Sequence, residues 1–324
     1  MTKPTDPVEY FAMTYEAVRR QVAGVLQGKP EAVRLALTGL FAGGHLLIED
    51  VPGVGKTTLA KAIAGALDAS WQRIQFTPDL LPSDITGTNV YDPRAGTFDF
   101  RPGPVFAHLV LADEINRASP KTQSALLEVM EERQVTVDGR AHPVPTPFCV
   151  VATQNPVDLE GTYRLPEAQL DRFLLRITIG YPSQAAETGI LTGRVVSGAR
   201  TAVAAQPVCT LEQVRWMREY TARVHVADPV AGYIAGIAQA TRGHRRLRLG
   251  ASPRASLALL SAAQVWAAAE GRGYVTPDDV QAVAEPVLAH RLLVDAEAEI
   301  QGVRPTDILA EVLGTVPVPA LDAA

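Results

Sequence analysis

Short apolar runs alternate with helical patterns through the first half of the chain. Each run is continuous and bounded by polar or turn residues, which is typical of a buried strand. Five such runs are expected to be strands: His45–Glu49, Trp71–Phe76, Leu109–Ala112, Phe148–Ala152 and Leu174–Ile179. Helical spacing separates several of them, notably over Lys56–Leu67 and Thr122–Glu132. This alternation predicts an α/β fold with a mostly parallel sheet flanked by helices.

Two stretches interrupt this alternation. Thr77–Val105 is rich in Pro, Gly and Asp, and Thr97–Phe100 within it alternates like a strand. In Arg133–Thr146, the apolar-polar run Gln134–Val137 is followed by Asp138-Gly139, a strong signal for a hairpin turn. Both stretches are therefore expected to be insertions that rise from the sheet.

The chain also carries helical patterns at its two ends. Val8–Leu40 has helical apolar spacing with a break, so two helices are expected there. In the second half the strand signals stop, and Ala-rich runs such as Ser256–Glu270 and Pro277–Ala289 are helical in pattern. We therefore expect a core domain over residues 1–182, and a linker with an all-helical domain over residues 183–324.

Charge and cysteine content narrow the range of partners and compartments. The 30 basic and 35 acidic side chains give a net charge of −5, which makes nucleic acid an unlikely main partner. Of the two cysteines, Cys149 lies in an apolar run and is expected to be a buried thiol; the other is Cys209. The N-terminal residues do not resemble a signal peptide, and no apolar run is long enough to span a bilayer. We expect a cytoplasmic protein without membrane insertion.

The segment Asp50–Thr58, with the letters DVPGVGKTT, follows a predicted strand and opens a predicted helix. That is the context of a phosphate-binding loop, in which glycines let backbone N–H groups surround phosphate oxygens. Lys56 is expected to reach the β- and γ-phosphates, and the Thr57 hydroxyl to ligate Mg²⁺. Asp50 replaces the usual first glycine, and we attribute this to the tolerance of aspartate for unusual backbone angles. The predicted nucleotide-binding residues are Gly53, Val54, Gly55, Lys56, Thr57 and Thr58.

Polar residues end two further predicted strands. Asp113 and Glu114 follow the apolar run Leu109–Ala112, and Asn155 follows Phe148–Ala152. Downstream of a phosphate loop, Asp113 is expected to hold Mg²⁺ and Glu114 to polarise the attacking water. Asn155 is expected to position that water or contact the γ-phosphate. Each signal has a plain structural alternative, a helix cap for the acidic pair and a turn for the asparagine.

Five segments of the chain, in this order, resemble motifs of the MoxR family of AAA+ ATPases. They are Ala42–Thr57, Ala112–Ala118, Thr153–Pro156, Glu167–Phe173 and Gly250–Ala255. The resemblance extends from about Val25 to the last helices, and aspartate is ordinary in this family at the first position of the phosphate loop. It implies a five-stranded AAA+ core with a helical lid and identifies the two insertions as the helix-2 insert and the hairpin before sensor 1.

The resemblance also implies an activity and partners. It implies Mg²⁺-dependent ATP hydrolysis by a hexameric ring, coupled to chaperone-like remodelling of client proteins, including proteins with von Willebrand factor A domains. It makes Asn155 sensor 1, Arg172 the arginine finger that reaches a neighbouring subunit, and Arg254 sensor 2. In this reading one subunit supplies the phosphate loop, metal ligand, base and sensors, and its neighbour supplies the finger. Arg117 and Arg164 are the other candidates for the finger.

Two positions depart from the family pattern. Lys29 stands where the family usually has glutamine, which leaves the contacts on the adenine side open. The run Arg242–Arg248 is unusually basic and is expected to be a solvated loop, with a contact to a partner or to the nucleotide as the alternative.

Three other functions remain open. A magnesium-chelatase-like motor subunit would require a porphyrin-handling partner. A DNA-remodelling ring would show salt-sensitive DNA binding. A nucleotide-binding scaffold without turnover would have no need of Glu114, Asn155 and Arg172.

Overall fold

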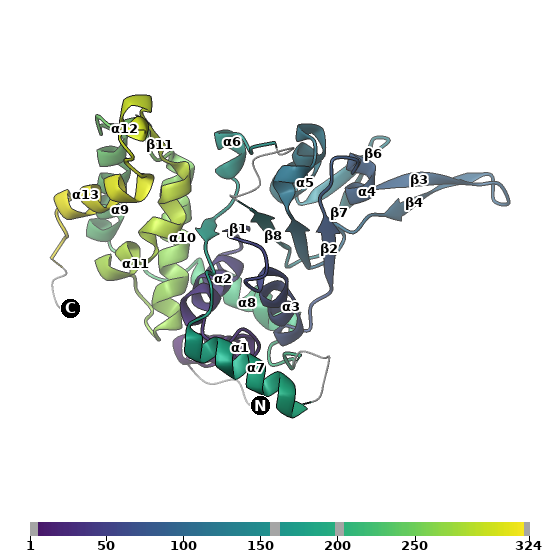
Figure 1. Ribbon diagram of the computed structural model, residues 1–324, viewed down its shortest axis with the longest axis horizontal. Helices are drawn as coiled ribbons and strands as arrows, with labels where there is room; N and C mark the ends of the chain where they lie inside the picture. The colour runs from purple at the N-terminus through teal and green to yellow at the C-terminus, as the bar shows by residue number, and fades with distance from the viewer. Residues whose placement is uncertain (1–5, 156–162, 198–203, 321–324) are drawn as a thin grey trace.

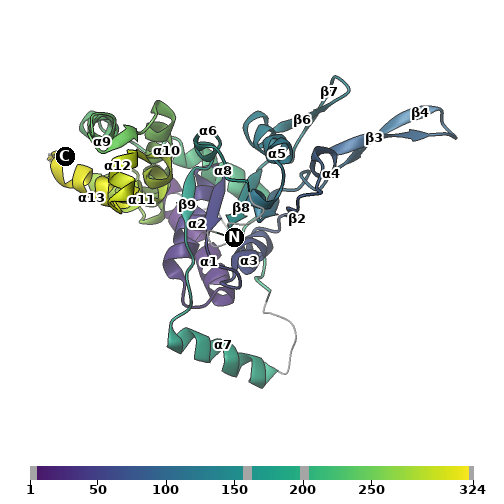
Figure 2. The same cartoon turned by 45° about the horizontal axis from the view of Figure 1, so that its top comes forward.

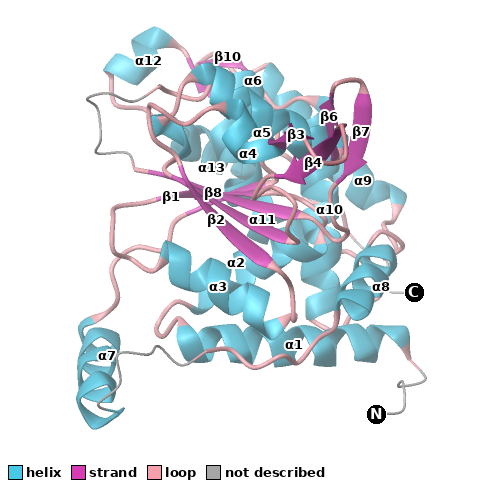
Figure 3. Cartoon of the chain, turned by 90° about the vertical axis from the view of Figure 1, so that its right-hand side faces the viewer, coloured by secondary structure: helices cyan, strands magenta, loops and turns pink. Residues whose placement is uncertain are grey.

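A single parallel sheet forms the centre of the molecule in the computed structural model, which describes residues 6–155, 163–197 and 204–320 (Figure 1). The strand order is β2-β5-β8-β1-β9, and all neighbours are parallel. The strands span Trp71–Gln75 (β2), Leu109–Asp113 (β5), Cys149–Gln154 (β8), Leu46–Glu49 (β1) and Leu175–Ile177 (β9). These bounds confirm the five expected strands and the α/β fold. Because all five run parallel, the residues that follow them meet at one edge of the sheet, visible in Figure 3.

Helices cover both faces of this sheet. Along β1, Leu46 and Ile48 belong to one buried cluster and Leu47 to the other, as the alternation of side chains along a strand requires. The helices of the core are α1 (Pro7–Val25), α2 (Pro30–Phe41), α3 (Lys56–Ala66), α4 (Pro82–Thr86), η1 (Ile115–Arg117), α5 (Pro120–Glu132) and α6 (Glu167–Leu170). The first cluster contains residues of α1, α2 and α3, and the second contains residues of α5.

Two antiparallel hairpins extend from the core on the side opposite the lid (Figures 1 and 2). One joins β3 (Gly87–Asp92) to β4 (Thr97–Pro102), and the other joins β6 (Gln134–Val137) to β7 (Arg140–Pro143). The two hairpins touch each other, because the Phe100 ring stacks on His142 with centroids 3.9 Å apart. The insertions predicted from the sequence are thus confirmed, although β3 was not predicted.

The C-terminal half is helical, as expected, and packs against the core. Its elements are α7 (Gln184–Ser197), α8 (Leu211–Thr221), α9 (Asp228–Arg242), β10 (Leu247–Leu249), α10 (Pro253–Ala269), α11 (Pro277–Leu288), η2 (Ala289–Arg291), β11 (Leu293–Val294), α12 (Ala296–Ile300) and α13 (Pro305–Thr315). Helix α8 packs on the core through Trp216, whose ring meets that of Tyr10 edge-on at 4.9 Å. Helix α10 packs on α1 and α2, and the Arg34 guanidinium lies 3.5 Å from the centre of the Trp266 ring. The lid proper, α9 to α13, thereby packs against the N-terminal helices of the core through α10.

The structure also bears on the predictions for the basic run, for Cys149 and for membrane-spanning segments. The basic run Arg242–Arg248 is not simply a solvated loop, because part of it forms β10 and Arg246 pairs with Glu311. Burial raises the pKa of the Cys149 thiol to about 11, which confirms a buried, unreactive cysteine. Within the described ranges no helix combines the length and apolarity needed to cross a membrane. Pro156, the last residue of the asparagine motif, lies outside the described residues.

Candidate active site

The phosphate loop joins the end of β1 to the start of α3 and borders a cavity of about 330 Å³. Gly53 and Gly55 take left-handed backbone angles, with φ of 86° and 102°, which non-glycine residues rarely adopt. The N-terminus of α3 faces this cavity, and the first N–H groups of a helix have no acceptor within the helix. The cavity is lined by Pro52, Gly53, Gly55, Lys56, Thr57, Thr58, Arg73, Asp113, Glu114 and Asn155. Its floor is therefore built to hold an anion.

Lys56 and Asp50 fix the shape of the loop. The Lys56 ammonium donates to the carbonyl oxygens of Asp50 at 2.5 Å and Gln154 at 3.2 Å. The Asp50 carboxylate accepts from three backbone N–H groups, those of Val51 at 2.8 Å, Ile179 at 2.7 Å and Gly180 at 2.5 Å. Aspartate stands at this position because its side chain ties the loop to the chain that leaves β9. Backbone freedom is not the reason, since its φ is not positive.

One hydroxyl from β8 contacts both acidic residues at the end of β5, the side chain of Asp113 and the backbone of Glu114. The Thr153 hydroxyl, which is fully buried, donates to Asp113 Oδ1 at 2.6 Å and accepts from the backbone N–H of Glu114 at 2.8 Å. Glu114 has a φ of 58° and a ψ of 50°, a left-handed conformation that is unfavourable for a side chain of this size. Thr153 therefore orients the Asp113 carboxylate and holds the backbone of Glu114 in this conformation.

Strand β2 contributes two residues that the sequence analysis missed. Arg73 donates to Asp113 Oδ2 from Nε at 3.0 Å and from Nη2 at 2.7 Å. Gln75 accepts from Arg73 at 2.6 Å and donates to Glu114 Oε2 at 2.9 Å. Arg117 also donates to this glutamate oxygen, at 3.0 Å. The site is therefore a continuous polar network in which each acidic side chain has a basic partner.

Most residues predicted to form this site come together. Of the residues predicted in the phosphate loop and at the ends of the two strands, Val54 alone does not line the cavity; it is 7% exposed and belongs to the first core cluster. Asn155 is buried at 6% exposure and lines the cavity at the end of β8. The placement of Lys56, Thr57, Asp113, Glu114 and Asn155 around one space is what the chemistry of phosphoryl transfer requires.

Arg172 and Arg254 lie elsewhere. Both contact the carboxylate of Glu131, with N–O distances of 3.1 Å and 3.3 Å. They line a second cavity of about 310 Å³, together with Arg133 and Arg291, and this cavity shares no residue with the one at the phosphate loop. The expectation that Arg254 completes the nucleotide site of its own subunit therefore differs from its position in the structure. Arg254, the arginine of the lid, instead lies beside Arg172, the predicted finger.

The other two arginines considered for the finger have different surroundings. Arg117 pairs with Glu114 of its own site, as described above. Arg164 is exposed and does not line either of these cavities. Neither shares the surroundings of Arg172.

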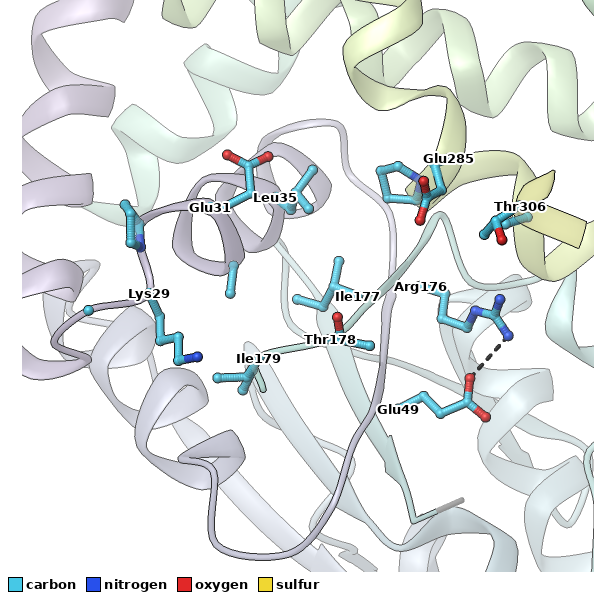
Figure 4. Close-up of a pocket in the computed structure, with 15 residues that line it drawn as sticks. Lys29, Glu31, Leu35, Glu49, Arg176, Ile177, Thr178, Ile179, Glu285 and Thr306 are labelled. Carbon is cyan, nitrogen blue, oxygen red and sulfur yellow. Dashed lines mark hydrogen bonds and ion pairs between the residues drawn. The ribbon is translucent and has the colours of Figure 1, made fainter. Parts of the chain in front are cut away.

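A third cavity, of about 520 Å³, lies along the outer edge of β9 between α2 and the lid helix α11 (Figure 4). The Lys29 ammonium stands at its border and donates to the carbonyl oxygen of Tyr181 at 2.5 Å. Arg176 forms an ion pair with Glu49 at 3.0 Å across the opposite side. Gly28 has a φ of 74°, and a side chain there would meet Ala186 of α7 at 2.6 Å. Lys29 thus holds the segment between β9 and α7 against the start of α2. It is the residue that departs from the usual glutamine of the family.

Comparisons with known proteins agree with this architecture. A family model described as "ATPase family associated with various cellular activities (AAA)" matches residues 45–175, and one described as "AAA lid domain" matches residues 239–312. The chain is 42% identical over 319 residues to "Chaperone MoxR1" of Mycobacterium tuberculosis, covering 96% of this chain and 84% of the relative. It is 32% identical to "Protein MoxR" of Methylorubrum extorquens, covering 93% and 94%. The chain belongs to the MoxR family of AAA+ ATPases.

Two further likenesses extend over nearly the whole MoxR fold. The uncharacterized protein YeaC of Bacillus subtilis is 47% identical over 300 residues, covering 93% of each chain. A crystal structure of a protein from Cytophaga hutchinsonii named as an ATPase superposes with a TM-score of 0.90 at 37% identity, covering 97% of each chain. The protein is therefore a nucleotide-binding ATPase with an AAA+ core and an AAA lid.

Proposed function

We propose that this MoxR-family ATPase works as a homo-oligomeric ring, a hexamer, in which each ATP is hydrolysed between two subunits. The observation that carries the proposal is the separation of Arg172 and Arg254 from the phosphate loop of their own chain. Phosphoryl transfer gains much of its rate from arginine side chains that neutralise charge in the transition state. Two subunits that contact each other through different faces bring the arginine pair of one to the nucleotide of the next, and such contacts close into rings.

The residues around the phosphate loop divide the work at each site. Lys56 and the N-terminus of α3 bind the β- and γ-phosphates, and Asn155 orients the γ-phosphate. Glu114 accepts a proton from the attacking water, after leaving its bonds to Gln75 and Arg117. Arg172 and Arg254 of the neighbour release Glu131 and contact the transferred phosphate.

Mg²⁺ is the metal that these donors fit. Asp113 offers a carboxylate and Thr57 a hydroxyl, and both line one cavity. Mg²⁺ prefers oxygen ligands and usually takes only one or two carboxylates from the protein, the rest coming from phosphates and water. The part of the chain that the structure describes holds no cluster of three or more His, Cys, Asp or Glu side chains suited to a metal. When bound, the ion neutralises charge on the phosphates.

The energy of hydrolysis remodels client proteins, and the hairpins are the elements that touch them. Tyr91 is 52% exposed and Phe98 67% exposed, and they form an aromatic pair beyond the contact between the two hairpins. Exposed aromatic groups of this kind are typical of surfaces that bind other proteins. The relative named as a chaperone supports this role, and the family resemblance favours partners with von Willebrand factor A domains.

Mixing two inactive variants tests the shared site. Lys56→Ala subunits should not bind ATP but carry an intact Arg172. Arg172→Ala subunits should bind ATP but lack the arginine finger. Mixed rings contain sites with an intact phosphate loop and an intact finger, so part of the ATPase activity should return. Light scattering with nucleotide present shows whether the mixture assembles. Assembled mixtures without activity would place Arg172 outside catalysis between subunits.

A further inference from the structure

The segment that carries Arg172 is held on both sides of this residue. We call Asp171–Leu174, between α6 and β9, the finger loop. Asp171 contacts the lid, and Phe173 is fully buried in the second core cluster. Between them the side chain of Arg172 is 29% exposed and turns to Glu131. The direction of Arg172 therefore depends on what fixes its two neighbours.

The lid residue Arg291 makes most of the contacts between the lid and the finger loop. Its Nε donates to Asp171 Oδ1 at 2.6 Å, and its Nη2 donates to the carbonyl oxygens of Phe173 at 2.7 Å and Asp171 at 3.2 Å. Its Nη1 donates to the carbonyl oxygen of Leu174 at 3.1 Å and to that of Val287 in the preceding helix α11. A guanidinium has five N–H donors, and five acceptors surround this one. Four of the five belong to the finger loop.

Two more lid side chains contact the same loop. His290 is 5% exposed, and burial lowers the pKa of its ring well below the usual value. Because a carbonyl oxygen only accepts, Nε2 is the protonated ring nitrogen and donates to the carbonyl oxygen of Phe173 at 3.1 Å. From the start of α10, the Ser252 hydroxyl contacts Asp171 Oδ2 at 3.3 Å. Two separate lid elements, η2 and the N-cap of α10, thus hold one short loop.

A gain in folding stability alone does not explain why Arg291 is buried against the finger loop. The side chain of Arg291 is only 4% exposed, and moving a guanidinium out of water costs several kcal/mol, which an ion pair often does no more than offset. A rigid, planar donor that satisfies three carbonyl groups does, however, fix the path of a backbone. The contacts of Arg291 are therefore suited to fixing the backbone conformation of the finger loop.

We propose that Arg291 is a positioning residue that couples the finger loop to the lid of the same subunit, so that a shift of the lid is passed to Arg172. Any rotation of the lid on nucleotide binding then moves Arg172 relative to the neighbouring site. The nucleotide state of one subunit thereby controls hydrolysis in the next. This inference rests on the proposed use of Arg172 between subunits.

The test introduces Arg291→Lys either into the subunit that donates Arg172 or into the subunit that binds ATP, but not into both. In rings mixed from Lys56→Ala and Arg172→Ala subunits, the first donate the finger and the second bind ATP. Adding Arg291→Lys to the donor should lower the turnover number by about tenfold or more, because a small misplacement of a catalytic group is costly. The KM for ATP should stay the same, since the binding side is unchanged. Adding it to the ATP-binding subunit should change the rate less than about twofold.

Two further variants separate positioning from loss of structure. Arg272 forms a partly buried ion pair with Asp279 inside the lid, at 2.5 Å, and its hydrogen bonds go to Tyr274, Thr276 and Asp279, outside the finger loop. Arg272→Lys in the donor should therefore leave the rate of the mixed ring unchanged. If Arg291→Lys does not fold, Asp171→Asn removes the same ion pair from the loop side and should give the same donor-specific loss.

The outcomes distinguish this inference from the function on which it rests. An equal loss from both placements, matched by a lower unfolding midpoint, would make Arg291 merely structural and overturn the inference. A normal rate with the variant in the donor would overturn it as well. If the starting mixture of Lys56→Ala and Arg172→Ala assembles and has no activity, the shared site itself is wrong and the inference falls with it.

Discussion

Asp50 ties the phosphate loop to the chain leaving β9 through three backbone N–H groups, two of them from Ile179 and Gly180. Asp50→Gly introduces the residue that is usual at this position in phosphate loops, yet it should destabilise the protein. Buried N–H groups lose a charged acceptor, so the free energy of unfolding should fall by about 3 kcal/mol. Urea denaturation measures this, with Asp50→Asn, which keeps one acceptor oxygen, expected to lose less. Unchanged stability of Asp50→Gly would show that the three bonds contribute nothing.

Glu114 and Lys56 line one cavity but have different proposed tasks. Glu114→Gln keeps the size and hydrogen bonding of the side chain and removes the base, so ATP should bind while turnover falls by about 10²-fold or more. Lys56→Ala should bind ATP much more weakly, because a charge contact to the phosphates is lost. Equilibrium titration with a fluorescent ATP analogue and a phosphate-release assay measure the two effects. Loss of ATP binding by Glu114→Gln would instead place Glu114 in the metal shell.

The sequence predicts the site residues that follow a recognisable local pattern and misses those that depend on strand order. Lys56, Asp113 and Glu114 stand in such patterns. Arg73 and Gln75 do not, because their contacts arise only when β2 pairs with β5, in a register that sets Gln75 opposite Asp113. Arg254 illustrates the same limit, since its motif does not say which nucleotide it faces.

At the scale of elements, the β3–β4 hairpin is the clearest candidate for contact with clients. Tyr91 and Phe98 are paired across the two strands and exposed, so replacing both with serine should leave stability and basal ATPase activity unchanged. It should abolish any stimulation of the ATPase by reduced, carboxymethylated lactalbumin, a permanently unfolded probe. Val90→Ser, on the opposite face of the same hairpin, is the matched control. Equal stimulation of the double variant and the wild type would exclude this tip from client binding.

Element type was predictable from the sequence where periodicity is strong, and not where partners decide it. The five sheet strands and the long helices have continuous or helical apolar patterns. Strand β3 has no buried residue and no continuous apolar run, so its sequence is typical of a loop. It becomes a strand because β4 pairs with all of it from Gly87 to Asp92. The attachment of α8 to the core, through Trp216 and Tyr10, likewise depends on tertiary contact. The domain boundary at residues 182 and 183 therefore stays a prediction.

At the scale of the whole molecule, the proposed ring requires each subunit to supply two separate halves of a site. The phosphate loop with its acidic residues lies at the end of the parallel strands, and the arginine pair lies between α5, the finger loop and the lid. If the site is shared as proposed, an isolated subunit has an incomplete site, whatever its affinity for ATP. Loss of a transition-state arginine costs about 10³-fold in rate in related phosphoryl-transfer enzymes, so a monomer should be almost inactive.

The most direct test of this account is the rate of ATP hydrolysis per subunit, measured over a wide dilution series together with the mass by light scattering. The account predicts that the rate per subunit rises with concentration in step with the fraction of assembled protein. Arg172→Ala should assemble equally and stay inactive throughout the series. A rate per subunit that remains constant down to concentrations at which the protein is monomeric would contradict catalysis between subunits.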